Sequence, residues 1–370
     1  MLARLVARLD RRRIESRVIS LTTMGSIGHK IQEAGVPVFA LGLRPGRAGP
    51  VALWRLAALL RRLRPDVVHT WLYHADLAGI MAGPLAHGPK IVWNIRCADL
   101  DPADHPWSLP LLLRTLAFLS RYPAAIVYNS AAGRHAHEKL GYTPRRWEII
   151  PNGFDTERFR PSSDARIELR RELGLNPGAL VVGLLARMHP MKDHATFLRA
   201  AAIAAQSRAD VHFVAAGRGV AGDAALEAMV ADLKLGDRVR LLSERNDAPR
   251  FLAGLDVAVS SSYGEAFPNV VGEAMACGTP CVVTNVGDSA QIVGDAGLIV
   301  PPRDAAALAA GVMRLLTLGP VSRDSVRLAA RERIKSRFSL SAVADKYEQL
   351  YRDVAGHPPV DSTKQPVCAG

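Results

Sequence analysis

The stretch YGEAFPNVVGEAMAC at residues 263–277 places a loop and a helix directly after an apolar run at residues 257–260. Pro268 suits the first turn of a helix, and Gly278 suits its end. The segment therefore predicts a strand–loop–helix unit, which is the repeating element of an α/β fold.

Two glutamates in this unit, Glu265 and Glu273, indicate a ligand site. Glu273 lies in an apolar run, where a buried carboxylate is costly unless a polar group pairs with it. A ligand rich in hydroxyl groups supplies such a partner. We expect Glu265 in the loop and Glu273 about two turns into the helix, because an eight-residue step turns by about 800° and separates their faces. The segment is a candidate sugar site.

Apolar, β-branched runs of the same kind recur along the chain with helical segments between them, which favours parallel sheets. The first half has candidate strands at residues 18–21, 36–41, 67–70, 91–95, 125–129 and 148–150. The second half has them at residues 180–186, 211–216, 239–242, 257–260, 281–284 and 298–300. Two such series predict an α/β protein of two doubly wound domains.

The turn-rich stretch at residues 151–161 is the expected joint between the domains. We expect an acceptor-side domain over residues 1–155, completed by an amphipathic C-terminal helix at residues 339–355. The second domain is expected over residues 156–338. The tail at residues 357–370 lacks periodicity and is expected to be disordered.

The chain opens in a basic amphipathic helix, with Leu2, Leu5, Val6 and Leu9 on its apolar side. A doubly wound domain ordinarily opens with a strand and a glycine-rich turn. We therefore expect that the first strand of the N-terminal domain is absent, with roughly 10–20 residues missing through a mis-called start codon. A transit peptide is the alternative, but no cleavage-like site follows the helix.

Positive charge is concentrated in the first half of this chain, whose net charge is +12. Residues 1–150 carry 21 Lys and Arg against 10 Asp and Glu, whereas residues 151–370 carry 26 against 25. A basic surface attracts nucleic acid, anionic lipid or a phosphorylated substrate, and a solvated arginine-rich surface is equally compatible. No pattern typical of nucleic-acid binding supports the first of these.

The sequence contains no apolar run near the roughly 20 residues that cross a bilayer. Its 4 cysteines show neither metal-ligand nor disulfide spacing, which fits a reducing compartment. We expect a cytoplasmic protein that is open to peripheral contact with the inner face of the membrane.

Two cations, Arg187 and Lys192, follow the first strand of the second half. We expect them at the carboxyl edge of a parallel sheet, beside a helix that starts near Lys192, and this combination suits a diphosphate. Alone, this spacing is more typical of surface charge than of a binding site. Gly217 and Gly219 lie in a similar turn after the next strand, where glycine allows the backbone to approach a ligand closely.

Together these motifs resemble the retaining glycosyltransferases of family 4, whose GT-B architecture has two facing Rossmann-like domains. The matching segments are the Glu265/Glu273 pair, the Arg187/Lys192 pair, IIPNGFD at residues 149–155, CGTPCVVT at 277–284 and GLIVPP at 297–302. The segments VWNIR at 92–96 and DLD at 99–101 resemble the acceptor domain of the branch that makes O-antigen and other surface polysaccharides.

The resemblance implies a role for each matching residue. The implied catalytic group is Glu265, which contacts the donor sugar, together with Arg187 and Lys192, which neutralise the donor diphosphate. Glu273 is implied to bind the ribose. The other implied donor-binding residues are Gly217, Gly219, Ala266, Phe267, Asn269, Val270 and Arg245, the last of these near the base.

On the acceptor side the candidates are His69, Arg96 and Asn152. Many family members carry a histidine where this chain has Arg96, so the histidine's role near the anomeric carbon does not carry over. His69, at a neighbouring strand end, is the candidate replacement, although a lone strand-end histidine is more often structural. Asp99 and Asp101 have the form of a metal motif of unrelated transferases, but we expect turn or cap residues here.

The sequence thus predicts a glycosyltransferase that moves a sugar from a nucleoside diphosphate sugar to a lipid-linked saccharide or similar acceptor. It predicts no cofactor, no metal and no nucleic-acid partner. Two alternatives remain open: a nucleotide-sugar 2-epimerase of the same architecture, and a truncated, non-catalytic binder of sugar nucleotides.

Overall fold

The computed structural model describes residues 1–44, 49–98 and 108–356. Asp99, Asp101 and the tail at residues 357–370 lie outside the described residues, so the predictions made for them stay predictions. Every strand predicted from the sequence is present within two residues of its expected limits. The strands are β1 (Val18–Ser20), β2 (Val38–Ala40), β3 (Val67–Trp71), β4 (Lys90–Ile95), β5 (Ala125–Tyr128), β6 (Trp147–Ile149), β7 (Leu180–Leu185), β8 (Val211–Ala216), β9 (Val239–Leu242), β10 (Val257–Ser260), β11 (Cys281–Thr284) and β12 (Leu298–Val300).

Helices connect the strands in the alternating order that parallel sheets require. They are α1 (Leu2–Arg8), α2 (Gly25–Glu33), α3 (Pro50–Leu63), α4 (Tyr73–Ala82), α5 (Ser108–Leu119), α6 (Ala131–Lys139), α7 (Ser163–Glu172), α8 (His194–Ser207), α9 (Ala224–Asp232), α10 (Ala248–Gly254), α11 (Asn269–Ala276), α12 (Ser289–Val293), α13 (Ala305–Leu316), α14 (Pro320–Phe338) and α15 (Leu340–Ala355). Short 3₁₀ turns lie at Pro190–Lys192, Gly236–Arg238 and Gly294–Ala296.

The C-terminal half, β7 to β12, forms one parallel sheet in the order β12-β11-β10-β7-β8-β9. Successive residues of a strand point to opposite faces. Val181 therefore packs with α11 and α14, whereas Val182 packs with α8 and α13. This is the doubly wound arrangement that the sequence predicts, with helices on both faces.

The N-terminal half, β1 to β6, divides into two sheets instead of the one predicted. Strands β1 and β2 pair only with each other, and β3 to β6 form a parallel sheet of their own. A doubly wound sheet reverses its order around a central strand, and the described residues include no strand that pairs with both β1 and β3. Helix α1 joins the two sheets, because Val6 packs against Ile31 and Val36 while Leu5 packs on the larger sheet.

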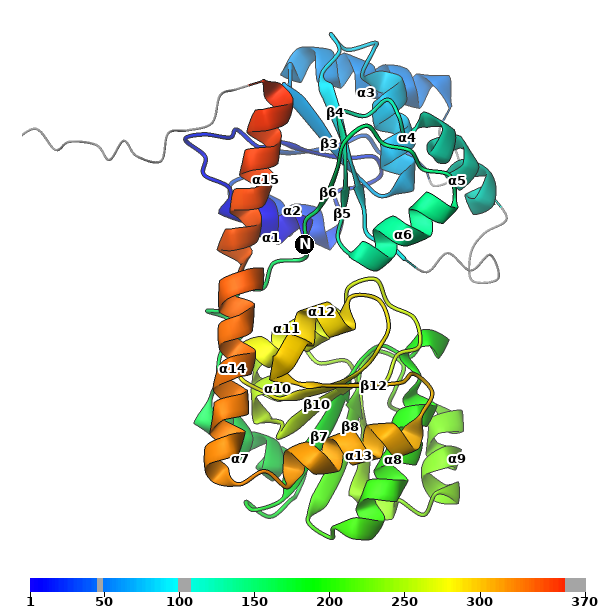
Figure 1. Cartoon of the computed structure of the whole chain (residues 1–370). Helices are drawn as coiled ribbons and strands as arrows, with labels where there is room; N and C mark the ends of the chain where they lie inside the picture. Colours follow the sequence, from blue (N-terminus) through cyan, green and yellow to red (C-terminus); the bar gives the residue numbers. More distant parts are fainter. Residues whose placement is uncertain (45–48, 99–107, 357–370) are drawn as a thin grey trace, which may run out of the picture.

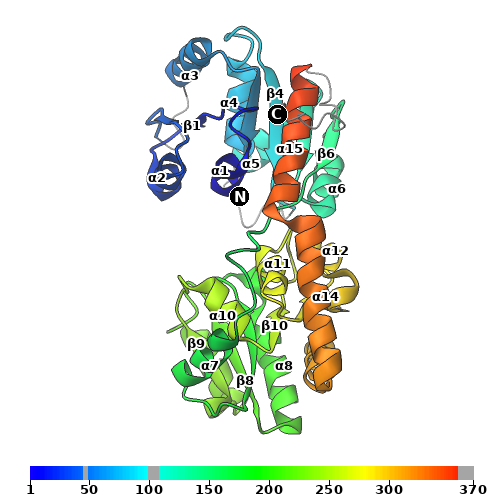
Figure 2. The same cartoon turned by 90° about the vertical axis from the view of Figure 1, so that its left-hand side faces the viewer.

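Helices α14 and α15 form one long column along the side of both halves (Figure 1). The predicted terminal helix is present as α15, and Ser339 caps it by accepting a hydrogen bond from the Ala342 amide. Its residues Val343 and Tyr347 pack on the β3–β6 sheet. The chain crosses between the halves at Phe154 and again at Ser339, and these two crossings pair as a parallel bridge. Figure 2 turns the left-hand side of Figure 1 toward the viewer and shows α15 beside the N-terminal half and α14 beside the C-terminal half.

Within the described residues, no single helix is both long and apolar enough to span a membrane. Helices α13 and α14 pass that test only as a pair, and they are bent by 112° at their junction. Leu308 and Ile334 of this pair are buried in the C-terminal cores.

Candidate functional site

Lys192 and Glu265 meet at the carboxyl edge of the C-terminal sheet. The ammonium group of Lys192 donates a hydrogen bond to Oε1 of Glu265, and the Ser262 hydroxyl donates to the same oxygen at 2.8 Å. Oε2 of Glu265 has no hydrogen-bond partner within the described ranges. The sequence prediction of a loop position for Glu265 is confirmed, since the residue precedes α11. One carboxylate oxygen is held and the other is left for a ligand.

Two loops are tied together to bring these residues into contact. The Tyr263 amide donates to the carbonyl of Met191 at 2.9 Å. The Ser261 hydroxyl lies 2.9 Å from the Lys192 carbonyl and 3.0 Å from that of Asp193. The loop after β10 therefore fixes the loop after β7 through its backbone.

Helix α11 begins at Asn269 without a side-chain cap. The amides of Asn269 and Val270 find no acceptor among the described residues. Free first-turn amides and the positive end of the helix dipole favour an anion. Gly278, at a φ of +72°, follows the C-cap, so the predicted start and end of this helix are confirmed.

The second helix N-terminus lies near Lys192 as predicted, but it is already capped by an acidic residue. Lys192 ends a 3₁₀ turn, and α8 starts only at His194. Asp193 caps α8 by accepting the Thr196 amide at 3.0 Å. An acidic side chain thus already occupies that N-terminus, and α11 is the better place for a phosphate.

Glu273 lies about one helical turn into α11, not two as predicted, because only four positions separate it from the helix start at Asn269. Its Oε1 is 3.6 Å from a guanidinium nitrogen of Arg4, which belongs to α1 in the other half. Burial raises the pKa of Glu273, while the charges of Arg4 and Arg158 act in the opposite direction. The buried carboxylate has found a cation across the interface between the halves.

Gly217 and Gly219 sit where β7 and β8 end side by side. A side chain at Gly217 would place its Cβ 2.0 Å from the carbonyl oxygen of Ala186. Gly219 has a φ of +79°, which favours glycine. The Met188 amide donates to the Arg218 carbonyl at 2.8 Å, so the two loops are in backbone contact.

The remaining donor-side candidates differ in how far they are engaged. Arg187 is exposed and has no ion-pair partner in the described part of the chain. Arg245 is paired with Glu172 and, at 2.7 Å, with Asp247. The Phe267 ring is buried against Phe154, 6.1 Å between centroids. Any contact of Phe267 with a donor would therefore come through its backbone, whereas Ala266 is only half-buried.

Asn152 connects the acceptor-side candidates to α11. Arg96 donates to its Oδ1, and its Nδ2 donates to Oδ1 of Asn269 at 2.7 Å. Arg96 also stacks over the Trp71 ring at 4.8 Å. The structure thus brings Arg96 and Asn152 to the start of α11.

His69 packs against α15 instead. Its Nδ1 is 2.7 Å from the Tyr351 hydroxyl, and the Tyr347 and Tyr351 rings lie 5.6 and 5.5 Å away. Burial, and then the charge of Arg96, lower the pKa of His69 to about 3. A neutral imidazole among aromatic rings favours the structural alternative over a role near the anomeric carbon.

One contact across the halves was missed from the sequence. Both carboxylate oxygens of Asp288, just before α12, accept amides at the start of α6: Ala131 at 2.9 Å and Ala132 at 3.0 Å. Burial raises the pKa of Asp288, and these two amides oppose the shift. The Asp288 amide also donates to the Ala266 carbonyl at 3.0 Å, next to Glu265. The sequence signal that could have indicated this contact is the position of Asp288 just after β11, the fifth strand of the C-terminal half.

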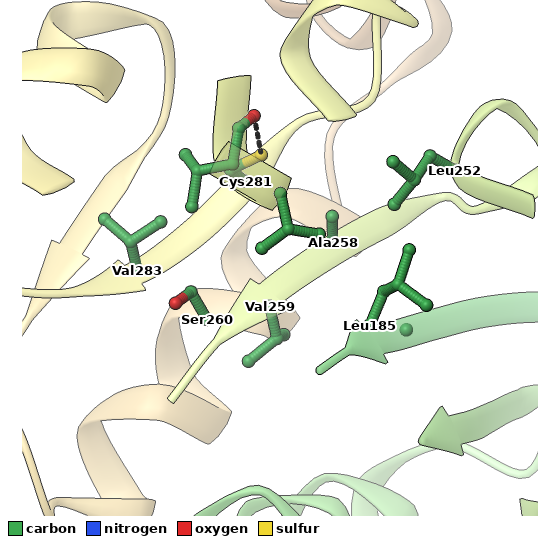
Figure 3. A pocket seen from close by; sticks show the side chains of 10 residues that line it. Leu185, Leu252, Ala258, Val259, Ser260, Cys281 and Val283 are labelled. Atoms are coloured by element: carbon green, nitrogen blue, oxygen red, sulfur yellow. Dashed lines mark hydrogen bonds between the residues drawn. The ribbon is translucent and has the colours of Figure 1, made fainter. Parts of the chain in front are cut away.

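An enclosed cavity of about 10 Å³ lies between β7, β10, β11 and α11 (Figure 3). Its lining is almost wholly apolar, and Cys281 Sγ donates weakly to the Val271 carbonyl at 3.8 Å. A space of this size admits about one water at most. It is a packing gap beneath α11.

No group of three or more His, Cys, Asp or Glu side chains suited to a metal ion occurs in the ranges that the structure describes. The expectation of a reaction without metal stays a prediction.

Comparison with known proteins adds a second line of evidence. A family model described as Glycosyltransferase Family 4 matches residues 1–158, and one described as Glycosyl transferases group 1 matches residues 179–318. The D-inositol 3-phosphate glycosyltransferase of Geodermatophilus obscurus is 30% identical over 308 residues, which cover 78% of this chain and 67% of the relative.

Two further proteins show the range of similarity. The UDP-Gal:alpha-D-GlcNAc-diphosphoundecaprenol alpha-1,3-galactosyltransferase of Escherichia coli is 26% identical over 312 residues, covering 82% of this chain and 79% of the relative. The structure of Anabaena HepE in complex with UDP and glucose superposes with a TM-score of 0.80 at 22% identity, over 95% of both chains.

Proposed function

Because the chain belongs to glycosyltransferase family 4, has the GT-B fold and is a glycosyltransferase, we propose that it transfers a sugar from a nucleoside diphosphate sugar to a lipid-linked saccharide. We propose further that the anomeric configuration is retained. The observation that carries the proposal is the meeting of Lys192, Glu265 and the uncapped start of α11 at one sheet edge.

The donor assignment rests on charge at that edge. Arg187 is exposed, Lys192 is close by in sequence, and the amides of Asn269 and Val270 are free to donate. Cations and helix amides together suit a diphosphate. The Anabaena structure was solved with UDP and glucose, and the E. coli relative is named for UDP-Gal, which supports a nucleotide sugar.

The proposed step forms a bond from the acceptor oxygen to the anomeric carbon while the bond from that carbon to the β-phosphate oxygen breaks. The acceptor hydroxyl proton passes to the departing phosphate on the same face of the sugar, which gives retention. Arg187 and Lys192 stabilise the negative charge that develops on the phosphate. Oε2 of Glu265 is free to orient a sugar hydroxyl.

The acceptor proposal rests on the surface of the N-terminal half. Helix α4 lies against both α3 and α5, so the three form one layer. Large apolar side chains of α3 and α5 are exposed, among them Trp54 at 64% and Phe118 at 65%. Arg121 lies 4.4 Å over the Phe118 ring. Apolar side chains beside arginines suit an anionic bilayer, where a lipid-linked acceptor is found.

Turnover with a panel of nucleoside diphosphate sugars tests the donor and the acceptor together. The acceptors are an undecaprenyl-diphosphate-linked saccharide and D-inositol 3-phosphate, and free nucleotide and product are measured. We expect nucleotide release that needs the lipid-linked acceptor and falls by about 10²–10³ in Lys192→Ala. The anomeric proton coupling of the product reports retention.

Other outcomes of this assay would replace the proposal. Transfer to D-inositol 3-phosphate alone would assign the acceptor class of the Geodermatophilus relative. A changed sugar from donor without acceptor would indicate the 2-epimerase. Nucleotide-sugar binding with no turnover on any acceptor would indicate a non-catalytic binder.

Vesicle sedimentation tests the membrane contact. Binding should rise with the fraction of anionic lipid, fall with salt, and weaken in Trp54→Ser/Phe118→Ser. Binding that ignores both lipid charge and the two substitutions would refute the contact. Ile167→Ser/Ile203→Ser is the matched control, because these exposed residues lie in the C-terminal half.

A further inference from the structure

A cavity with a polar lining lies at the opposite edge of the C-terminal sheet, away from the loops that carry Lys192 and Glu265. Its volume is about 450 Å³. Asp256, in its lining, directly precedes β10, whereas Glu265 follows that strand. The lining comes from the start of α7, the start of α14 and Asp256: Pro161, Ser162, Ser163, Arg166, Asp256, Arg323, Asp324 and Arg327.

The one buried carboxylate of this cavity is already saturated. Oδ1 of Asp256 accepts from Arg166 at 3.3 Å, and its Oδ2 accepts from Arg170 and, at 2.7 Å, from the Val181 amide. Two guanidinium groups therefore share one carboxylate. Asp256 can neutralise no further cation.

Two more arginines enter from α14, one turn apart. Arg323 donates to the Leu318 carbonyl at 3.2 Å, a neutral acceptor, and Arg327 has no side-chain partner in the described ranges. The charge of Arg327 acts on the neighbouring guanidinium group of Arg170. Burial lowers the pKa of Arg170 to about 10, and the charges of Arg166 and Arg327 contribute in the same direction.

The cluster as a whole has an excess of positive charge. Among the described residues that line the cavity, the arginines Arg166, Arg323 and Arg327 stand against two carboxylates, Asp256 and the exposed Asp324, and Asp256 is also paired with Arg170. Guanidinium groups bind phosphate through paired hydrogen bonds. The volume falls within the range of about 300–1,000 Å³ that is typical of small-molecule sites.

We propose that this cavity is a second anion site, which binds a phosphorylated small molecule through Arg323 and Arg327 with Arg166 at its floor. The helix start at Ser163 adds its dipole to the same space. The site is independent of the donor site, since it shares no residue with it and lies at the other ends of the strands.

Calorimetric titration with inorganic pyrophosphate tests the site. The donor edge also attracts this probe, so the titration uses Arg187→Ala/Lys192→Ala, in which that edge is disabled. We expect one saturable site in this protein. Adding Arg323→Ala and Arg327→Ala to this protein should lower its affinity for pyrophosphate by at least about tenfold.

The matched control adds Arg171→Ala and Arg314→Ala instead, which removes the same charge from exposed positions on α7 and α13. It should bind as the parent does. Equal pyrophosphate affinity in the two quadruple variants would overturn the proposal, as would the absence of saturable binding in the parent. Should the quadruple variant unfold, Arg327→Glu is added by itself to Arg187→Ala/Lys192→Ala. This residue has no side-chain partner in the described ranges, and the pyrophosphate affinity of the triple variant is compared with that of the parent.

Discussion

Glu265 uses one carboxylate oxygen for the protein and keeps the other. Lys192 and Ser262 both donate to Oε1, which fixes the orientation of the group. The sequence placed Glu265 in a loop before a helix, but it gave no indication that a lysine 73 residues away would pair with it. That pairing follows from the contact of two loops.

Glu265→Gln removes the charge and keeps the size. We expect turnover to fall by about 10²–10³, because the preorganised negative charge at the reacting sugar is lost. Far-UV circular dichroism should be unchanged. The control is Glu244→Gln, at an exposed position. Near-normal nucleotide release from Glu265→Gln would show that the residue is not at the reacting centre.

His137 supports a prediction about pH. It is buried on α6, with Nδ1 2.7 Å from the Gly133 carbonyl and Nε2 3.0 Å from the Tyr73 hydroxyl. Burial lowers its pKa to about 4, against about 6.5 in the unfolded chain. Between these values the unfolded state binds more protons, so stability is lost as the pH falls from 6.5 to 4.

The expected loss between pH 7 and pH 4.5 is about 2–3 kcal/mol, as judged from urea unfolding. His137→Gln keeps a donor and an acceptor but cannot titrate, so it should lack this loss. His69, whose pKa is also lowered by burial, acts in the same direction in both proteins, and Asp76 and Asp288, whose pKa values are raised, act in the opposite direction in both. The difference between the two proteins therefore reports His137. Identical pH dependence in the two proteins would contradict the assignment to His137.

At the scale of the element, α11 shows what local sequence can specify. Pro268 and Gly278 set its limits as predicted, and Gly272 lets the Phe154 ring approach, since a Cβ there would lie 2.1 Å from the ring. The depth of Glu273 was predicted wrongly by about one turn. The helix predicted to start near Lys192 starts two residues later, at His194, because Asp193 is its capping residue.

Asn269→Pro tests the amides of α11. Proline is well tolerated at the first helical position, where the amide has no intrahelical partner, and Pro268 already has the extended ψ of 99° that precedes a proline. Asn269→Ala is the control, since it removes the side chain and keeps the amide. We expect nucleoside diphosphate to bind about tenfold more weakly to Asn269→Pro than to Asn269→Ala. Equal affinities of the two variants would show that the Asn269 amide does not contact the nucleoside diphosphate.

At the scale of the whole molecule, the two halves meet through polar contacts on both sides of the candidate site. Arg4 reaches Glu273, and Asp288 reaches the start of α6. Ser130 caps α6 through the Gly133 amide and leaves the amides of Ala131 and Ala132 to Asp288. The Asp288 contact joins the loop that carries Glu265 to the N-terminal half, so we expect it to hold the halves together.

Asp288→Asn should weaken this contact, because one carboxylate oxygen becomes an NH₂ group that faces an amide donor. Loss of one charged hydrogen bond should raise amide hydrogen exchange at Ala131 and Ala132 about tenfold or more. Asp295→Asn, at an exposed position in the same half, is the control. Unchanged exchange in Asp288→Asn would show that the halves are held by other contacts.

The sequence by itself determined the twelve strands, the limits of α11 and the loop position of Glu265, because side-chain alternation, proline and glycine act over a few residues. Tertiary structure alone decided the partners. Lys192 with Glu265, Arg4 with Glu273 and Asp288 with α6 join residues far apart in the chain. It also placed His69 against α15. A buried charge takes whichever partner the packing of distant elements brings near it, and local sequence carries no record of that packing.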